Sequence, residues 1–172
     1  MTAETKEIKN PIIEREISRA RDLYKRHAVA ICADENLGGM LARYGEAISN
    51  TREKMNLTGM LEACSACAGD MDGSCCFRGV EEWYDSSLLL INLLLGIEIP
   101  FFREVPGNCL FLGENGCRLL AKHSFCINYL CPDLKAFMGP LVADFLRVVG
   151  DELSCGWELE LSLCTWIHEN GG

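Results

Sequence analysis

The sequence predicts a mainly α-helical protein: a small, irregular helical domain with a cysteine-rich centre made of loops and a hairpin. Two observations predict this class. Apolar residues recur at helical spacing on both sides of the centre, and eight of the eleven cysteines lie between positions 64 and 131. A chain of 172 residues suits one compact domain. We therefore expect N-terminal helices over 1–63, a cysteine-cluster region over 64–131 and C-terminal helices over 132–172.

Two helices are expected before the cysteines. Over residues 10–33, Asn10 suits the N-cap and Pro11 suits the first helical position. Apolar spacing places six residues on the stripe of this helix: Ile13, Ile17, Ala20, Tyr24, Ala28 and Ile31. A second helix is expected over residues 37–55, with its inward face formed by Leu37, Leu41, Tyr44, Ile48 and Met55.

The centre combines irregular and regular segments. Residues 64–79 are rich in Gly, Ser, Asp and Cys, so we interpret them as loop. A leucine-rich helix follows, with Asp85 as its cap and Gly96 just past its end, and it is expected to be the central core helix. Residues 109–120 are expected to form a short hairpin, because Asn115-Gly116 tolerates the positive φ angles of a tight turn.

The C-terminal region is expected to be helical after Cys131-Pro132. Asp133 is interpreted as the cap, and Pro140 is expected to kink the helix or end its first half. The expected inward residues are Leu134, Phe137, Met138, Leu141, Phe145 and Val148. Residues 157–163 alternate as a strand would, but Leu and Glu favour helix. A helical face there would contain Leu153, Trp157, Leu161 and Cys164.

Charge and hydropathy exclude several classes of partner. The net charge of −9 and the pI near 4.8 argue against nucleic acid. The first seven residues hold no apolar segment of the kind found in secretory signals. The longest apolar run, 88–97, contains Asn92 and is shorter than the ~20 residues that a membrane span requires. We therefore expect a cytoplasmic protein with no nucleic-acid and no membrane partner.

Eleven cysteines in a cytoplasmic protein are expected to be reduced, because disulfides persist mainly in oxidising compartments. Clustered reduced cysteines are usually metal ligands or redox groups. Eight occur as four pairs: Cys64-x2-Cys67, Cys75-Cys76, Cys109-x7-Cys117 and Cys126-x4-Cys131. A C-x2-C step in a tight turn directs two sulfurs at one ion, in zinc and iron–sulfur sites alike. These eight are therefore the candidate metal ligands, whereas Cys32, Cys155 and Cys164 are interpreted as small buried hydrophobic residues.

The cysteine pattern resembles the YkgJ-like family of zinc- or iron-chelating cysteine-cluster proteins. The resemblance covers residues 64–131 and rests on the eight cysteines together with Phe111, Leu112, Gly116 and Tyr129. Two departures lie in its last element, where Lys122-His123 replaces a usual Arg-Pro and Ile127 replaces an arginine. The resemblance implies metal binding through the cysteines and specifies no activity.

Eight thiolates are enough for two four-cysteine sites, either two zinc ions or two iron–sulfur cubanes. Cys75 and Cys76 are not expected to bind one mononuclear ion together, because adjacent side chains diverge. The leucine-rich segment 88–97 and Phe101-Phe102 are expected to provide an apolar wall, so an iron–sulfur cluster is favoured over zinc. His123 is an alternative ligand, although a polar structural role is the simpler interpretation.

Three functions follow from this pattern. The favoured one is a metal-binding protein that holds iron–sulfur clusters for electron transfer, redox sensing or metal handling. The first alternative is a zinc-stabilised protein–protein interaction module with an unknown protein partner. The second is a metal- or thiol-dependent enzyme, with Cys126 and His123 as its one candidate pair. We favour a non-enzyme, because the sequence contains no G-x-G-x-x-G, P-loop or H-E-x-x-H motif.

Overall fold

The computed structural model describes residues 10–69 and 74–171. In chain order the elements are α1 (Pro11–Ala33), α2 (Glu35–Leu57), α3 (Met60–Gly69), the 3-10 helix η1 (Val80–Trp83), α4 (Ser86–Leu94), β1 (Leu112–Gly113), β2 (Gly116–Cys117), α5 (Ser124–Asn128), α6 (Pro132–Met138) and α7 (Leu141–Glu169). Helix accounts for 69% of the structure, and the one sheet of the described residues has two strands. These proportions confirm the predicted mainly α fold class.

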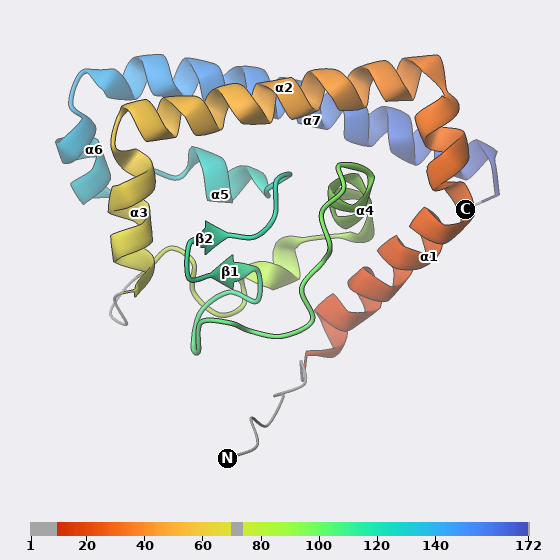
Figure 1. The fold of residues 1–172 in the computed structure, drawn as a ribbon, viewed down its shortest axis with the longest axis horizontal. Coiled ribbons are helices and arrows are strands. Elements are labelled where there is room, and N and C mark those ends of the chain that lie inside the picture. The colour runs from red at the N-terminus through yellow and green to blue at the C-terminus, as the bar shows by residue number, and fades with distance from the viewer. Residues whose placement is uncertain (1–9, 70–73, 172) are drawn as a thin grey trace.

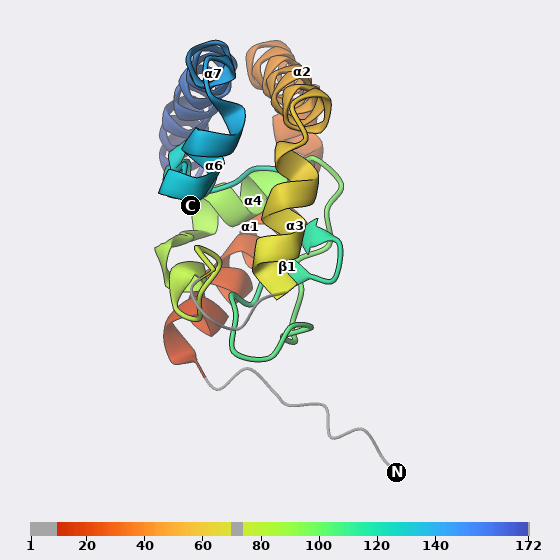
Figure 2. The ribbon, with the colours of Figure 1, turned by 90° about the vertical axis from the view of Figure 1, so that its left-hand side faces the viewer.

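Two long helices, α2 and α7, lie side by side along one edge of the molecule (Figures 1 and 2). Ion pairs join them at two points along their length, between Arg43 and Glu158 and between Lys54 and Asp144. Between these pairs Gly156 of α7 faces the buried ring of Tyr44 on α2. A methyl group added at Gly156 would lie only 3.0 Å from carbon atoms of that ring. Glycine is therefore required here for the close approach of the two helices.

Alanine substitutions at two glycines of α7 are expected to have opposite effects on stability. Gly156→Ala should lower the free energy of unfolding by about 1–3 kcal/mol, because the added methyl group overpacks the Tyr44 contact. Gly150→Ala is the matched control, since nothing lies within 4 Å of the added methyl group. It should raise the free energy of unfolding by about 0.5–1 kcal/mol through helix propensity. Urea unfolding measures both, and equal effects would contradict the packing of α2 on α7.

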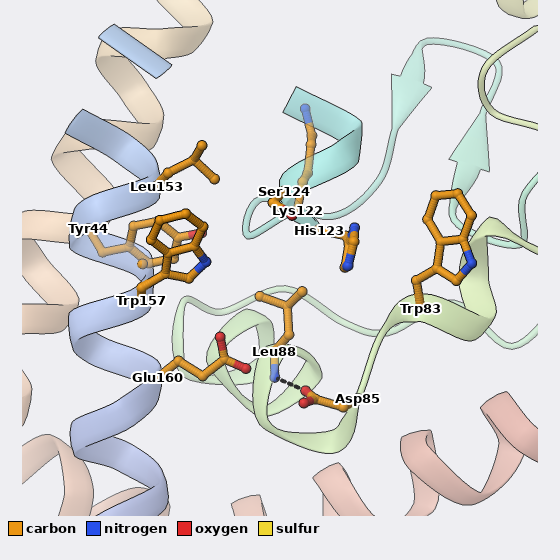
Figure 3. A pocket seen from close by; sticks show the side chains of 11 residues that line it. Tyr44, Trp83, Asp85, Leu88, Lys122, His123, Ser124, Leu153, Trp157 and Glu160 are labelled. Carbon is orange, nitrogen blue, oxygen red and sulfur yellow. Dashed lines mark hydrogen bonds between the residues drawn. The ribbon is translucent and has the colours of Figure 1, made fainter. Parts of the chain in front are cut away.

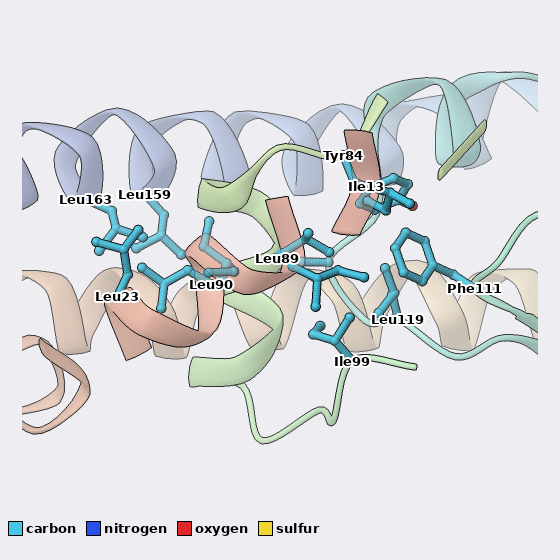
Figure 4. Packing of buried hydrophobic residues seen from close by; sticks show 14 of the residues in the cluster. Ile13, Leu23, Tyr84, Leu89, Leu90, Ile99, Phe111, Leu119, Leu159 and Leu163 are labelled. Carbon is cyan, nitrogen blue, oxygen red and sulfur yellow. The ribbon is translucent and has the colours of Figure 1, made fainter. Parts of the chain in front are cut away.

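Helix α4 lies at the centre of the main core and packs against α1 (Figure 4). Its Leu89, Leu90 and Ile91 are fully buried, which confirms the predicted central core helix. The buried Asn92 amide donates to the Ala121 carbonyl at 2.8 Å, and its oxygen accepts the N–H of the same residue at 3.0 Å. This polar residue of the apolar run therefore ties α4 to the segment that precedes α5.

The N-terminal helices agree with prediction except in detail. Asn10 caps α1 by accepting the Ile12 N–H, as expected. Tyr24 was wrongly placed on the buried stripe: it is 38% exposed, and Leu23 occupies the core position instead. Helix α2 begins earlier than predicted, because Asp34 accepts two N–H groups of its first turn.

The interpretation of residues 64–79 as loop was wrong for its first six residues. Residues 64–69 belong to α3, which follows a turn at Gly59 (φ +72°). Met60 of α3 is buried with Ile127 and Leu134 in a second apolar cluster. Helix is therefore favoured here by tertiary packing, which the local Gly/Ser/Cys composition does not reveal. Residues 70–73 of the predicted loop lie outside the described residues.

The hairpin and the proline break agree with prediction. Leu112 pairs with Cys117 in an antiparallel ladder, and the turn uses Gly116 at φ +101°. Helix α6 ends before Gly139, and Pro140 precedes α7, so the proline ends the first half of the predicted helix.

For α6 and α7, the predicted N-cap residue and part of the predicted inward face were wrong. Cys131, not Asp133, caps α6, because its sulfur accepts the Leu134 N–H. Phe137 and Leu141 are exposed, and Val149 is buried in place of the partly exposed Val148. The break between α6 and α7 resets the helical phase, so a single continuous stripe cannot describe both helices.

The C-terminal segment is helical, as favoured, and α7 runs to Glu169. The expected face was wrong, since Trp157, Leu161 and Cys164 are exposed. The buried residues of this half of α7 are instead Glu152, Gly156, Leu159, Leu163 and Ile167. Across residues 10–69 and 74–171, no helix combines the length and the apolar character required to cross a membrane.

Candidate metal centre

The eight candidate cysteines lie on four separate segments. Cys64 and Cys67 are one turn apart on α3, and Cys75 and Cys76 precede η1. Cys109 lies just before the hairpin and Cys117 ends β2, while Cys126 is on α5 and Cys131 caps α6. All are free thiols. The predicted C-x2-C turn is therefore a helical i, i+3 pair, a spacing that places both side chains on one face.

One group of sulfurs surrounds Cys64. Burial raises the pKa of the Cys64 thiol to about 11, and the thiolates of Cys75, Cys131 and Cys67 raise it further. An electrostatic effect of this kind falls off with distance, so these four sulfurs form a set within electrostatic range of Cys64. They come from three segments of the chain, and we call them the first group.

A second group contains Cys76, Cys109, Cys117 and Cys126. Burial raises the pKa of Cys109 to about 12, and the thiolates of Cys117 and Cys126 add to this. Burial also raises the pKa of Cys126 to about 11, with a further contribution from Cys117. Cys109 is tied to Cys76 through its backbone N–H, which donates to the Cys76 carbonyl at 2.7 Å.

The vicinal pair joins the two groups. The Cys76 thiol donates a hydrogen bond to Cys75, which lowers the pKa of Cys75 to about 6 and raises that of Cys76. The expectation that these two side chains diverge was therefore wrong. The Cys75 thiolate raises the pKa of both Cys64 and Cys126, so Cys75 lies within electrostatic range of both groups.

Three sulfurs accept hydrogen bonds from groups that sequence analysis did not identify. The Leu134 N–H donates to Cys131 at 3.4 Å, and the Tyr84 hydroxyl donates to Cys126 at 3.7 Å. The Phe111 N–H donates to Cys109 and lowers its pKa. The Cys131 contact follows N-cap spacing and was predictable from Cys131-Pro132. The Tyr84 contact spans 42 positions and has no local signal.

Lys122 is another residue that the prediction did not use. Its ammonium group lowers the pKa of both Cys64 and Cys126. It therefore lies close to both groups of sulfurs and stabilises their thiolate forms.

The expected apolar wall is only partly present. Cys76 and Cys109 belong to the same apolar cluster as the leucines of α4, as expected. Phe101 lies instead over the Arg21 guanidinium at 3.4 Å, and Phe102 lies near Arg118. The aromatic rings close to the cysteines are different ones. Phe77 and Phe125 follow and precede ligand candidates in sequence, and both make edge contacts with Trp83 at 5.9 and 5.0 Å.

His123 has a structural role. Its Nδ1 accepts the Phe125 N–H at 3.3 Å and caps α5, and burial lowers the pKa of its imidazole. The predicted enzyme pair needs a cysteine with a lowered pKa beside a base. Burial raises the pKa of Cys126 instead, and its polar partner is Tyr84. This pair therefore lacks the features of an activated nucleophile.

The three remaining cysteines lie outside both groups. Cys155 is partly buried, whereas Cys32 and Cys164 are exposed. The interpretation of the last two as buried hydrophobic residues was wrong. The Cys164 sulfur lies 3.3 Å from the Ser87 hydroxyl.

The donor chemistry of the two groups suits metals that prefer thiolate. All eight are sulfur donors, and several already accept hydrogen bonds, as cysteine ligands of iron–sulfur clusters do. Among the described residues, no three His, Cys, Asp or Glu side chains converge in the arrangement of a single metal-ion site. The chemistry of these donors therefore fits a thiolate-bound metal. The positions of the described side chains, however, do not bring three of them together around one point.

Fold and cysteines together define a mainly α-helical protein with eight free candidate thiols from four chain segments. No family model, no curated protein and no solved structure matches this chain. Its function is therefore inferred from its own residues.

Proposed function

We propose that this protein binds metal through two groups of four cysteines and that each group holds an iron–sulfur cluster. The first site would use Cys64, Cys67, Cys75 and Cys131, and the second would use Cys76, Cys109, Cys117 and Cys126. The observation that carries the proposal is the mutual electrostatic effect of these thiols, which come from segments up to 67 positions apart. The pattern also supports kinship with the YkgJ-like cysteine-cluster proteins.

Crowded, desolvated thiols are costly to ionise, and a bound metal removes this cost. Burial and neighbouring thiolates raise the pKa of Cys64, Cys109 and Cys126, so these groups are protonated at neutral pH without a metal. Metal binding would release these protons. Packing does not account for this cluster, because only Cys109 of the eight thiols is buried and four of them are exposed.

Hydrogen bonds favour iron–sulfur over zinc. Thiolate softness selects both metals, so affinity alone does not decide. The donors on Cys131, Cys109 and Cys126 and the positive charge of Lys122 are features that tune the reduction potential of iron–sulfur clusters. An iron–sulfur cluster would supply one-electron exchange, while the cysteines would hold it and the hydrogen-bond donors would act on its sulfur ligands. Electron transfer, redox sensing or metal handling in the cytoplasm are the roles that this chemistry serves.

Purification without oxygen tests the proposal. The full chain is expected to be brown, with a broad visible absorption band and about eight irons and eight sulfides for two four-iron clusters. Exposure to air should bleach this band. Colourless protein with two zinc ions per chain would contradict the iron–sulfur assignment.

The second candidate is a zinc-stabilised interaction module. It is favoured by the position of Cys64 and Cys131, which pack against the apolar cluster shared by α3, α5, α6 and α7. A zinc ion held there would tie these short helices together and stabilise the fold by about 10 kcal/mol or more. Zinc without iron, together with unfolding on addition of a chelator, would establish this alternative.

A further inference from the structure

A cavity of about 180 Å³ opens beside the cysteine groups and contains none of their sulfurs. It lies between α7, the start of α4 and the segment that leads into α5 (Figure 3). Its lining comprises Tyr44, Trp83, Asp85, Leu88, Lys122, His123, Ser124, Leu153, Gly156, Trp157 and Glu160. Polar, aromatic and charged groups therefore line a space that is large enough for a small ligand.

Two carboxylates on one side of this cavity lack a cation. Asp85 accepts the Leu88 N–H at 2.9 Å, but neither Asp85 nor Glu160 forms an ion pair with any residue that the structure describes. Burial raises the pKa of Glu160, and the charge of Asp85 raises it further. The two carboxylates therefore act on each other, and a cation between them would relieve that repulsion.

Lys122 does not neutralise this pair. Its side chain extends away from Asp85 and Glu160 in Figure 3, and its charge acts on Cys64, Cys126 and the neighbouring Glu152. His123 does not supply a charge either, because burial lowers the pKa of its imidazole. The floor of the cavity is therefore negative, and no positive group among the described lining residues is directed at it.

Aromatic rings line the opposite sides of the cavity. Trp157 projects from α7, and Trp83 lies across the cavity from it (Figure 3). The centroids of the Trp83 and His123 rings are 5.6 Å apart. Trp157 is 60% exposed, although a large indole normally packs against its neighbours. An indole face beside a carboxylate is the arrangement that attracts organic cations.

We propose that this cavity binds a small organic cation, with Asp85 and Glu160 pairing with its ammonium group and Trp157 covering its alkyl portion. A primary alkylammonium ion would also donate hydrogen bonds to the carboxylates, whereas a quaternary ion would rely on charge and the indole face. This inference does not depend on the metal proposal, because none of the eight candidate ligands lines the cavity.

Titration of the full chain, prepared without oxygen, tests the proposal by calorimetry and tryptophan fluorescence. The probes are n-butylammonium and tetramethylammonium chlorides, with tert-butanol as a neutral comparator of similar size and sodium acetate as an anion. Saturable binding of at least one cation, with no saturation by tert-butanol or acetate, is expected. Stronger binding of butylammonium would identify a primary amine as the ligand class, and stronger binding of tetramethylammonium a quaternary one.

Substitutions locate the binding. Glu160→Gln and Asp85→Asn should each weaken cation binding about tenfold, because each removes one charge-assisted contact. Asparagine retains the N-cap of α4, so Asp85→Asn keeps that helix start. Trp157→Ala should weaken binding about tenfold through loss of the cation–π contact. Glu158→Gln is the matched control, since Glu158 is on the same helix, lies outside the cavity lining and pairs with Arg43.

Two results would overturn the proposal. One is that neither cation saturates while the wild-type chain shows its full helical circular dichroism signal. The other is that Glu160→Gln and Glu158→Gln weaken binding equally, which would mean that the cation senses only net charge.

Discussion

Serine at Cys64 is expected to remove half of the bound iron and sulfide, and serine at Cys126 is expected to remove the other half. Each residue belongs to one group of thiols, because neighbouring thiols raise the pKa of Cys64 and of Cys126. A four-cysteine site that loses one ligand binds its metal far more weakly. Each single variant should therefore keep about four irons per chain and the double variant none, if each site holds a four-iron cluster. Iron and sulfide analysis of anaerobically purified protein provides the measurement.

Cysteines outside the two groups provide the control for this experiment. Cys32→Ser and Cys164→Ser remove exposed thiols, and both variants should retain the full metal content. Complete loss of metal from each single ligand variant would instead indicate one shared site. Unchanged metal in both ligand variants would exclude these cysteines as ligands.

Alanine at Phe111 is expected to lower the free energy of unfolding by about 3–5 kcal/mol. Phe111 is fully buried in the main core, so its removal leaves a large cavity. Its ring packs edge-on against Tyr84, with centroids 4.9 Å apart, and the Tyr84 hydroxyl donates to Cys126. The substitution should therefore also loosen the second group of sulfurs. Urea unfolding of the anaerobic protein measures the stability, and the visible spectrum reports on the metal.

Phe137→Ala is the matched control for the Phe111 substitution. Phe137 is the same residue type but is 62% exposed on α6. Its loss should change the free energy of unfolding by less than about 1 kcal/mol. Equal losses for Phe111 and Phe137 would contradict the described core.

The cavity and the candidate metal centre share one segment of the chain. The segment 122–126 contributes Lys122 and His123 to the cavity lining and Cys126 to the second group. His123 also contacts Tyr84, the residue that donates to Cys126, with ring centroids 6.2 Å apart. A ligand in the cavity would therefore lie against residues that adjoin the proposed cluster.

Helix starts were predictable where one side chain acts on its own neighbours. Asn10 and Asp85 accept N–H groups two or three residues ahead, so the contact is local in sequence. The same holds for the leucine-rich α4 and for the hairpin around Gly116, whose patterns are short and strong. The mainly α fold class follows from these local preferences.

Helix faces were less predictable, because burial depends on the partner rather than on spacing alone. Leu23 rather than Tyr24 is buried, and Val149 rather than Val148 is buried after the phase reset at Gly139-Pro140. Helix α3 was missed because its short Ala/Cys/Ser side chains resemble loop composition. It is stabilised by packing of Met60 in the second cluster.

The sequence by itself determined that the protein is mainly helical and predicted eight clustered cysteines as candidate ligands, because helix propensity, capping and cysteine spacing are properties of neighbouring residues. Only the tertiary structure decided which thiols are neighbours, that Tyr84 and Lys122 act on them, and that two carboxylates and two indoles surround a cavity beside them. These groups come from segments far apart in the chain. Burial and electrostatic interactions depend on distance in space, which local patterns do not encode.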